Sequence, residues 1–186
     1  MCNIETPRTK FSAIAISKSR ILILGGKQSD GQRTSEIEEY NVKSDTFKVL
    51  PFRLQKARSG FATCARDSKI YFCGGNGGGS HSGGNILKRF DCLDLKKGKW
   101  SKLVDMNVQR DELNVTLGPD GCVYAIGGFG GVNCEMQDSA CCLNSAEKYD
   151  FDKDCWTVLP SMTDARRALA VVAMPDGIYA IGGYDG

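Results

Sequence analysis

Pairs of adjacent glycines close four apolar runs in this chain, and they recur about every fifty residues. The pairs are Gly25 and Gly26, Gly74 and Gly75, Gly127 and Gly128, and Gly182 and Gly183, so their first members stand 49, 53 and 55 residues apart. Glycine makes up 22 of the 186 residues, about 12% against a usual ~7%. A fixed period of this length indicates a repeat architecture in which each unit buries its surface against the next.

The first half of each unit has the features of two antiparallel strands. An arginine stands three residues before a large apolar residue, and an apolar run follows; the arginines are Arg8, Arg58, Arg110 and Arg166. A turn such as Pro119-Asp120-Gly121 separates this run from the one that ends in the glycine pair. Two apolar runs joined by a short turn predict a β-hairpin.

The second half of a unit adds two more strands. After each of the first three glycine pairs, a polar loop is followed by two large residues seven positions apart: Tyr40 and Phe47, Leu93 and Trp100, and Tyr149 and Trp156. An acid lies two positions before the first member of each pair; the three acids are Glu38, Asp91 and Glu147. Each full unit is therefore predicted to be a four-stranded antiparallel meander. Such a sheet cannot bury both faces alone, so we expect the units to pack side by side around an axis.

The double glycine, the four strands and the aromatic seven residues after a tyrosine resemble the kelch repeat, and residues 156–186 are similar to the propellers of BTB-kelch adaptor proteins. The resemblance covers essentially the whole chain and implies an all-β fold, a kelch-type β-propeller of four-stranded antiparallel blades. Leu93 departs from the pattern where a tyrosine is expected, and Phe47 where a tryptophan is expected. Residues 1–186 are predicted to be one partial propeller with blade units 8–52, 58–106 and 110–162 and a half blade at 166–186. Because propellers close with about 4–8 blades, we expect these three and a half blades to be part of a longer propeller.

These motif residues are interpreted as structural. A glycine pair suits a strand end where the next backbone passes closely and where positive φ is needed. The large residues of the outer strands are expected to fill the wedge that widens between neighbouring blades. The glycine pairs and the three pairs of large residues are therefore not assigned to chemistry.

Composition narrows the function classes. Charged residues are 25% of the chain and hydrophobic residues 41%, as in ordinary globular proteins. A net charge of +2 argues against a nucleic-acid partner, and no apolar stretch approaches the ~20 residues of a membrane span. Nine cysteines without a visible secretory signal favour reduced thiols in a cytoplasmic protein, with Cys64, Cys73 and Cys122 acting as small hydrophobes. The cluster of Cys134, Cys141, Cys142 and Cys155 has no C-x-x-C pair, so no metal and no cofactor are predicted.

Catalytic motifs are not evident. The glycine-rich residues 74–79 lack the G-x-G-x-x-G spacing, and the Gly-Lys pairs at 26–27 and 98–99 are not followed by Ser or Thr. His81 is the only histidine, which leaves little material for a catalytic triad or a multi-histidine metal centre. The chain is therefore predicted not to be an enzyme.

The candidate site is a rim of loops. In this topology the loops 27–35, 76–84 and 129–144 share one end of the blades with the segments that enter each first strand. Kelch adaptors hold peptides and folded partners on this rim, so the resemblance implies a partner-binding role here for Arg8, Arg58, Arg110, Arg166, Lys27, Asn76, Phe129 and Tyr184. The alternative for the arginines is that they hydrogen-bond inter-blade carbonyls or stay solvated. Loop 129–144 is the best local candidate for specificity, because binding residues favour loops on rigid scaffolds.

Three hypotheses for function follow. The first is a non-enzymatic protein–protein interaction module that recognises substrates in a cullin-RING ubiquitin-ligase adaptor, an expectation from the resemblance alone. Its partner is a peptide or folded protein on the rim, with a cullin complex reached through another domain, and neither nucleic acid nor membrane. The second is an actin-associated cytoskeletal scaffold. The third, less favoured, is a propeller enzyme.

Overall fold

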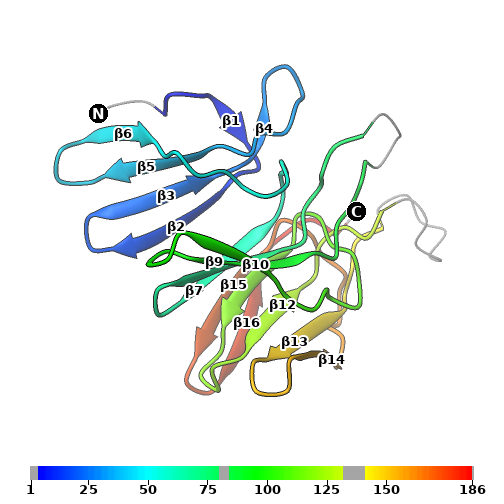
Figure 1. Ribbon diagram of the computed structural model, residues 1–186. Helices are drawn as coiled ribbons and strands as arrows, with labels where there is room; N and C mark the ends of the chain where they lie inside the picture. The colour runs from blue at the N-terminus through cyan, green and yellow to red at the C-terminus, as the bar shows by residue number, and fades with distance from the viewer. Residues whose placement is uncertain (1–3, 80–83, 132–140, 186) are drawn as a thin grey trace.

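The computed structural model of the protein describes residues 4–79, 84–131 and 141–185. Sixteen β-strands form the regular structure of these residues, and this part of the chain contains no helix long and apolar enough to cross a membrane. Most strands belong to three four-stranded antiparallel sheets and one two-stranded sheet, in sequence order (Figure 1). We call the three full sheets blades 1, 2 and 3 and the two-stranded sheet the half blade.

Each blade is a meander of neighbouring strands. Blade 1 consists of β2 (Ser12–Ser17), β3 (Arg20–Leu24), β5 (Ile37–Asn41) and β6 (Thr46–Val49). Blade 2 consists of β7 (Ala62–Arg66), β8 (Lys69–Cys73), β9 (Phe90–Asp94) and β10 (Lys99–Lys102). Blade 3 consists of β11 (Asn114–Leu117), β12 (Val123–Ile126), β13 (Ala146–Asp150) and β14 (Cys155–Leu159). The half blade is β15 (Ala170–Met174) with β16 (Gly177–Ile181), and a short pair joins β1 (Arg8–Thr9) to β4 (Lys27–Gln28).

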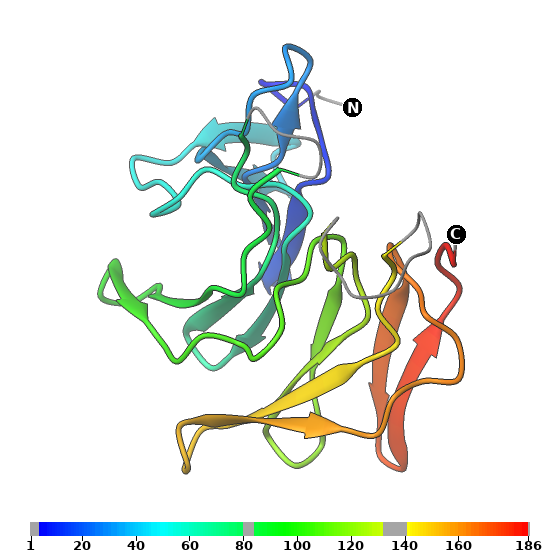
Figure 2. The ribbon, with the colours of Figure 1, turned by 90° about the vertical axis from the view of Figure 1, so that its right-hand side faces the viewer.

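The blades pack around a common axis with their first strands innermost. β2 contacts β7, β7 contacts β11, and β11 contacts β15. Figures 1 and 2 show the sheets fanned in sequence order, from blade 1 in blue to the half blade in red. The predicted fold of antiparallel four-stranded blades, arranged as a partial propeller, is confirmed.

One residue at the entrance of each blade belongs to a series of backbone hydrogen bonds that links successive blades. These residues are Lys10, Gly60, Glu112 and Ala168, and all have left-handed backbones with φ from +52° to +64°. The N–H of Gly60 donates to the carbonyl of Lys10, that of Glu112 to Gly60, and that of Ala168 to Glu112, each at 2.8 Å. The three bonds form one continuous path around the axis. A cavity of about 270 Å³ opens beside it.

Large side chains of the outer strands join neighbouring blades. In blade 3, Tyr149 and Trp156 are cross-strand partners, and the Trp156 ring centroid lies 5.0 Å from that of Phe90 in blade 2. Trp156 Nε1 also donates to the carbonyl of Val104, at 2.9 Å, so this side chain bridges two blades. The equivalent cross-strand pairs in the other blades are Tyr40 with Phe47 and Leu93 with Trp100. The apolar cores of the protein therefore lie between blades and not within one sheet.

The first glycine of each pair meets the backbone of the following blade. A Cβ on Gly25, Gly74 or Gly127 would lie 2.7, 2.4 or 2.5 Å from the carbonyl oxygen of the arginine that opens the next blade. All three have φ between +56° and +64°, where a side chain is strained in any case. Gly182 of the half blade has φ +64° as well, but nothing lies within 4 Å of its Cβ position. Blade-to-blade packing thus explains the glycine in blades 1 to 3.

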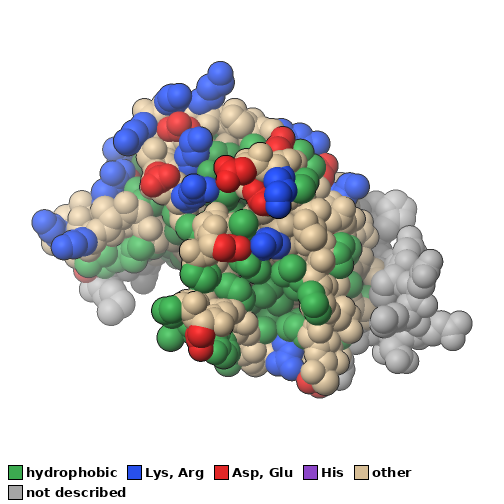
Figure 3. Space-filling view, turned by 90° about the horizontal axis from the view of Figure 1, so that it is seen from below, with side chains coloured by type: hydrophobic (Ala, Val, Ile, Leu, Met, Phe, Trp, Pro, Cys, Tyr) green, Lys and Arg blue, Asp and Glu red, His purple; other side chains and the backbone are tan. Residues whose placement is uncertain are grey.

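The two faces of the half blade differ. One face packs against blade 3 through Val171, Ile178 and Ala180. The other carries large apolar side chains that are 44–57% exposed: Val172, Met174, Tyr179 and Ile181. Figure 3 shows the molecule from below, where hydrophobic side chains reach the surface over a broad area and lysine and arginine side chains gather at one side.

The strand cysteines are buried thiols. Cys64 and Cys73 of blade 2 and Cys122 beside β12 are free and at most 9% exposed, which confirms their predicted place among the apolar side chains. Burial raises the pKa of Cys64 to about 12 and holds the pKa of Cys73 well above its usual range. A raised pKa keeps these groups in the unreactive thiol form.

Thiol labelling is expected to follow this burial. At pH 8, iodoacetamide should modify the half-buried Cys155 within minutes and leave Cys64 unmodified, because a pKa near 12 lowers the thiolate fraction by roughly a thousandfold. Peptide mass spectrometry after timed labelling measures both sites. Labelling in denaturant is the control, since both cysteines should then react alike. Equal rates in the folded protein would contradict the burial described above.

Candidate functional site

Three of the four arginines predicted on the rim lie inside the protein. The side chains of Arg8, Arg58 and Arg110 are fully buried, whereas that of Arg166 in the half blade is 26% exposed. The prediction that Arg8, Arg58 and Arg110 contact a partner is therefore wrong, because their guanidinium groups are not accessible.

Each buried arginine joins the second and third strands of its own blade. Arg110 donates from Nη1 to the carbonyl of Gly127 at 2.8 Å and from Nη2 to Glu147 Oε1 at 3.1 Å. The same contacts recur for Arg8 with Gly25 and Glu38, and for Arg58 with Gly74 and Asp91. Burial lowers the pKa of Arg110, and the charge of Glu147 opposes that shift. We call this set of an arginine, a glycine carbonyl and an acid the arginine bridge.

The backbone of the same arginines links one blade to the next. The N–H of the second glycine in a pair donates to the carbonyl of the following arginine: Gly26 to Arg58 at 2.9 Å, Gly75 to Arg110 at 2.8 Å, and Gly128 to Arg166 at 2.9 Å. The arginine side chain thus holds its own blade, and its backbone holds the preceding one. The alternative that these side chains hydrogen-bond inter-blade carbonyls is only partly right, because the guanidinium groups do bond to carbonyls, but to those of their own blade.

The other predicted rim residues differ in accessibility. Tyr184 is 52% exposed, Lys27 and Phe129 are half-buried, and Asn76 is buried. Asn76 accepts bonds from Arg33 Nη2 at 3.2 Å and from the N–H of Gly78 at 2.9 Å, so it fixes the conformation of its loop. Its position suits a positioning role in the rim more than direct contact.

Asp111 lies beside Asn76 on the inner side of the rim. Asn76 Nδ2 donates to Asp111 Oδ2 at 3.5 Å, which connects the second blade with the third. Burial, followed by the charge of Glu112, raises the pKa of Asp111, while Lys10 opposes the shift. Because a buried carboxylate with few hydrogen-bond donors is costly to ionise, the charge of Asp111 depends on the groups that lie next to it in this part of the rim.

Arg167 is a half-buried cation that the repeat pattern did not reveal. Its guanidinium lies 5.5 Å from the ring centroid of Phe129 and 5.0 Å from that of Tyr184. It pairs with Glu112 at 3.2 Å, and Glu112 also pairs with Lys10 across the axis. We call Phe129, Arg167 and Tyr184 the rim stack. Cation–π contacts of this kind keep an arginine ordered while one side stays open to a partner.

Arg33 lines a second opening on the rim, between blades 1 and 2. This pocket has a volume of about 520 Å³ and is formed by the loop ends of both blades, residues 30–33, 57 and 77–79. Glycines make up half of that lining, so backbone groups are accessible there. Arg33 Nε and Arg167 Nε are both buried with no hydrogen-bond partner among the described residues. Nε of Arg58, inside an arginine bridge, also lacks a partner, so this feature is not confined to the rim.

The predicted specificity loop 129–144 is described only at its ends, and residues 132–140 with Cys134 lie outside the described residues, as does His81. Cys141 is disulfide-bonded, so the expectation of reduced thiols is wrong at this position. In the described part of the chain, no three His, Cys, Asp or Glu side chains come together as metal ligands.

Comparison with known proteins agrees with this geometry. The family model described as the KLHDC2/KLHL20/DRC7 Kelch-repeats domain matches residues 2–183. The chain belongs to the kelch-repeat family. A solved structure titled "Structure of YjhT" has the same fold, with a TM-score of 0.75 and 16% identity over 96% of this chain and 59% of that one.

Curated kelch proteins resemble the chain over part of their length. "Kelch repeat and BTB domain-containing protein F47D12.7" of Caenorhabditis elegans is 29% identical over 96% of this chain and 30% of that protein. "Kelch-like protein 28" of Homo sapiens is 33% identical over 52% of this chain and 18% of that protein. The chain therefore spans less than a third of the length of these relatives.

Proposed function

We propose that this kelch chain is a non-enzymatic protein-interaction module that holds a peptide or folded protein on its loop rim. The observation that carries the proposal is the pair of rim arginines, Arg33 in a glycine-lined pocket and Arg167 in the rim stack. Arginine and aromatic side chains are the residues that most often dominate binding energy at interfaces. Membership of the kelch family supports a protein partner.

A binding role also fits the placement of the ionisable groups. Glu38, Asp91 and Glu147 are completely buried, and each is held by the guanidinium of an arginine bridge. These carboxylates serve the packing of the blades. The open rim, by contrast, carries accessible polar groups such as Asp30 and Gln32, which suits recognition of a surface or an extended peptide.

We further propose that the protein acts in the cytoplasm as the substrate-recognition part of a cullin-RING ubiquitin-ligase adaptor. This step is supported by relatives whose names combine kelch repeats with a BTB domain. A pull-down of purified cullin by the full-length parent tests it, and a parent that does not retain cullin would remove the adaptor role.

The cytoskeletal alternative rests on the kelch resemblance alone. Co-sedimentation of the parent with actin filaments in the absence of cullin would favour it.

Reversal of the rim charges is expected to weaken partner binding strongly. Arg33→Glu and Arg167→Glu should each raise the Kd by about thirtyfold, the effect of losing an interface residue worth about 2 kcal/mol. The partner is first identified by cross-linking mass spectrometry with the parent, and the Kd is then measured by titration calorimetry. Lys43→Glu and Lys48→Glu, which make the same charge change on exposed outer positions of blade 1, are the matched controls. Unchanged binding by both rim variants would exclude the rim as the contact surface.

A further inference from the structure

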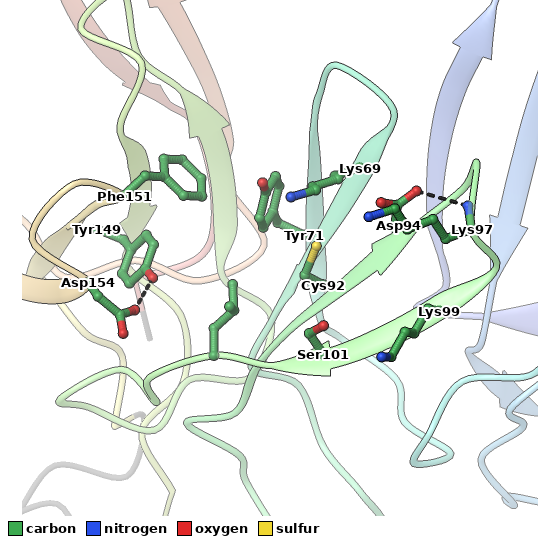
Figure 4. Close-up of a pocket in the computed structure, with 11 residues that line it drawn as sticks. Lys69, Tyr71, Cys92, Asp94, Lys97, Lys99, Ser101, Tyr149, Phe151 and Asp154 are labelled. Atoms are coloured by element: carbon green, nitrogen blue, oxygen red, sulfur yellow. Dashed lines mark hydrogen bonds between the residues drawn. The ribbon is translucent and has the colours of Figure 1, made fainter.

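A further cavity lies between blades 2 and 3 at the end opposite the rim. It has a volume of about 520 Å³ and opens beside the β9–β10 and β13–β14 turns (Figure 4). Its lining residues are Lys69, Tyr71, Cys92, Asp94, Lys97, Lys99, Ser101, Leu103, Tyr149, Phe151 and Asp154. We call it the basic pocket.

The register of blade 2 sets three charged side chains in a row on one wall. Lys69 of β8 pairs with Asp94 of β9, and Asp94 pairs with Lys99 of β10, so all three project from the same face of the sheet. Lys97 follows in the turn between β9 and β10. All three lysines are exposed, and their ends are free to turn towards an anion in the pocket.

The two carboxylates of the pocket already have donors. Asp94 Oδ1 accepts the backbone N–H groups of Lys96 and Lys97, both at 3.0 Å, and these bonds lower the pKa of Asp94. Asp154 accepts the hydroxyl of Tyr149, as Figure 4 shows. Three lysines against two aspartates leave a positive excess in the lining.

Aromatic rings form the floor. The ring centroid of Phe151 lies 4.9 Å from that of Tyr71 and 5.1 Å from that of Tyr149. Tyr71 and Tyr149 are at most 5% exposed, while Phe151 is half-buried and offers an apolar surface. Arg66 lies 4.8 Å above the Phe151 ring, which adds a further cation at the edge.

The junction of blades 1 and 2 has no equivalent chemistry. The cavity at that junction is half as large, about 260 Å³, and is lined mainly by apolar side chains such as Leu22, Leu50, Phe52 and Leu95. The chemistry of the basic pocket therefore differs from that of the cavity between blades 1 and 2 and does not follow from the repeat itself.

We propose that the basic pocket binds an acidic peptide segment of a partner protein, with carboxylates on Lys69, Lys97 and Lys99 and one apolar side chain on Phe151. Charge complementarity selects an anionic partner, and the aromatic floor selects one that carries apolar side chains. A dense polyphosphate fits less well, because Asp94 and Asp154 repel it, whereas a peptide backbone offers N–H donors to those carboxylates. The site is separate from the rim, so two partners can bind at once.

Fluorescence polarisation of the 186-residue chain tests this with a fluorescein-labelled peptide, Glu-Glu-Phe-Glu-Glu-Phe. Binding is expected at low salt, with affinity falling as ionic strength rises. The double variant Lys69→Glu/Lys99→Glu should weaken it at least about tenfold, since both charges then repel the probe. Ser101→Glu places a carboxylate in the pocket without removing a lysine, so it gives the same test if the double variant folds poorly.

The controls separate this site from the rim and from general charge effects. Lys43→Glu/Lys48→Glu makes the same charge change on blade 1, and Arg33→Glu alters the rim. At about 0.15 M salt, where the Debye length is about 8 Å, both should leave the Kd for the peptide within about twofold. Equal weakening by the blade 1 variant, no effect of the pocket variants, or no binding of the peptide would each overturn the proposal. Tighter binding of a hexathymidine oligonucleotide than of the peptide would also overturn it, in favour of a nucleic-acid partner.

Discussion

Replacement of Arg110 by methionine is expected to destabilise the protein by about 3–5 kcal/mol, because it leaves the carboxylate of Glu147 buried without its cation. Both side chains of this pair are completely buried, and the guanidinium also donates to the carbonyls of Gly127 and Ser145. Methionine retains the apolar volume but none of these donors. The effect should appear as a lower midpoint in urea unfolding followed by tryptophan fluorescence.

The chain supplies a matched control at the same motif position. Arg166 opens the half blade and bonds to the carbonyl of Gly182 at 2.8 Å, but its charge partner is the exposed Asp164. Arg166→Met should therefore cost less than about 1 kcal/mol, as expected of an exposed ion pair. In the double variant Arg110→Met/Glu147→Gln, a large part of the lost stability should return, since no buried charge remains. Equal losses for Arg110→Met and Arg166→Met would show that burial of the arginine bridge contributes nothing.

The sequence predicted the blades well because their determinants recur in every unit. The glycine pairs occur at the ends of the second strands, and residues seven positions apart, such as Tyr149 and Trp156, face each other across β13 and β14. The unequal loops between the second and third strands do not disturb this register, because each sheet is built from local hairpins. Spacing therefore predicted the four-stranded meanders and their packing around an axis, and the resemblance to the kelch repeat implied the propeller architecture.

The role of the arginines could not be derived in the same way. A recurring arginine is compatible with a surface contact or a buried one, since spacing does not say which way a side chain points. The useful signal was the second recurring charge: Glu38, Asp91 and Glu147 appear in the same units as Arg8, Arg58 and Arg110. Two opposite charges that repeat together at fixed places indicate a buried pair, because each then stabilises the other inside the protein.

The residues that remain available for binding lack that periodicity. Arg33, Arg167 and Lys69 occur in one blade each, at positions where the other units have different residues. Repeat spacing reveals the residues that the units have in common. A specific binding surface consists instead of residues that differ from one unit to the next. Only the three-dimensional structure brings Arg167 between Phe129 and Tyr184, which stand 55 residues apart in sequence.

The glycine pair offers a test of how the blades depend on one another. Gly127→Ala is expected to cost about 2–5 kcal/mol, from left-handed strain of about 1–2 kcal/mol and overpacking of about 1–3 kcal/mol. The overpacking arises because the new Cβ would lie 2.5 Å from the carbonyl oxygen of Arg166, which accepts the N–H of Gly128. The half blade would have to move away from blade 3, so the apolar contacts of Leu169 with blade 3 should loosen as well.

Gly182→Ala separates the two contributions. Gly182 has the same backbone conformation, with φ +64° against +61° at Gly127, but its Cβ position is open. The expected cost is therefore only the left-handed strain, about 1–2 kcal/mol. Hydrogen exchange followed by mass spectrometry locates the effect, since Gly127→Ala should speed exchange in β15 and β16, whereas Gly182→Ala should leave blade 3 unchanged. If the two substitutions cost the same, backbone strain alone would explain the glycine, and the close approach of successive blades would not be what requires it.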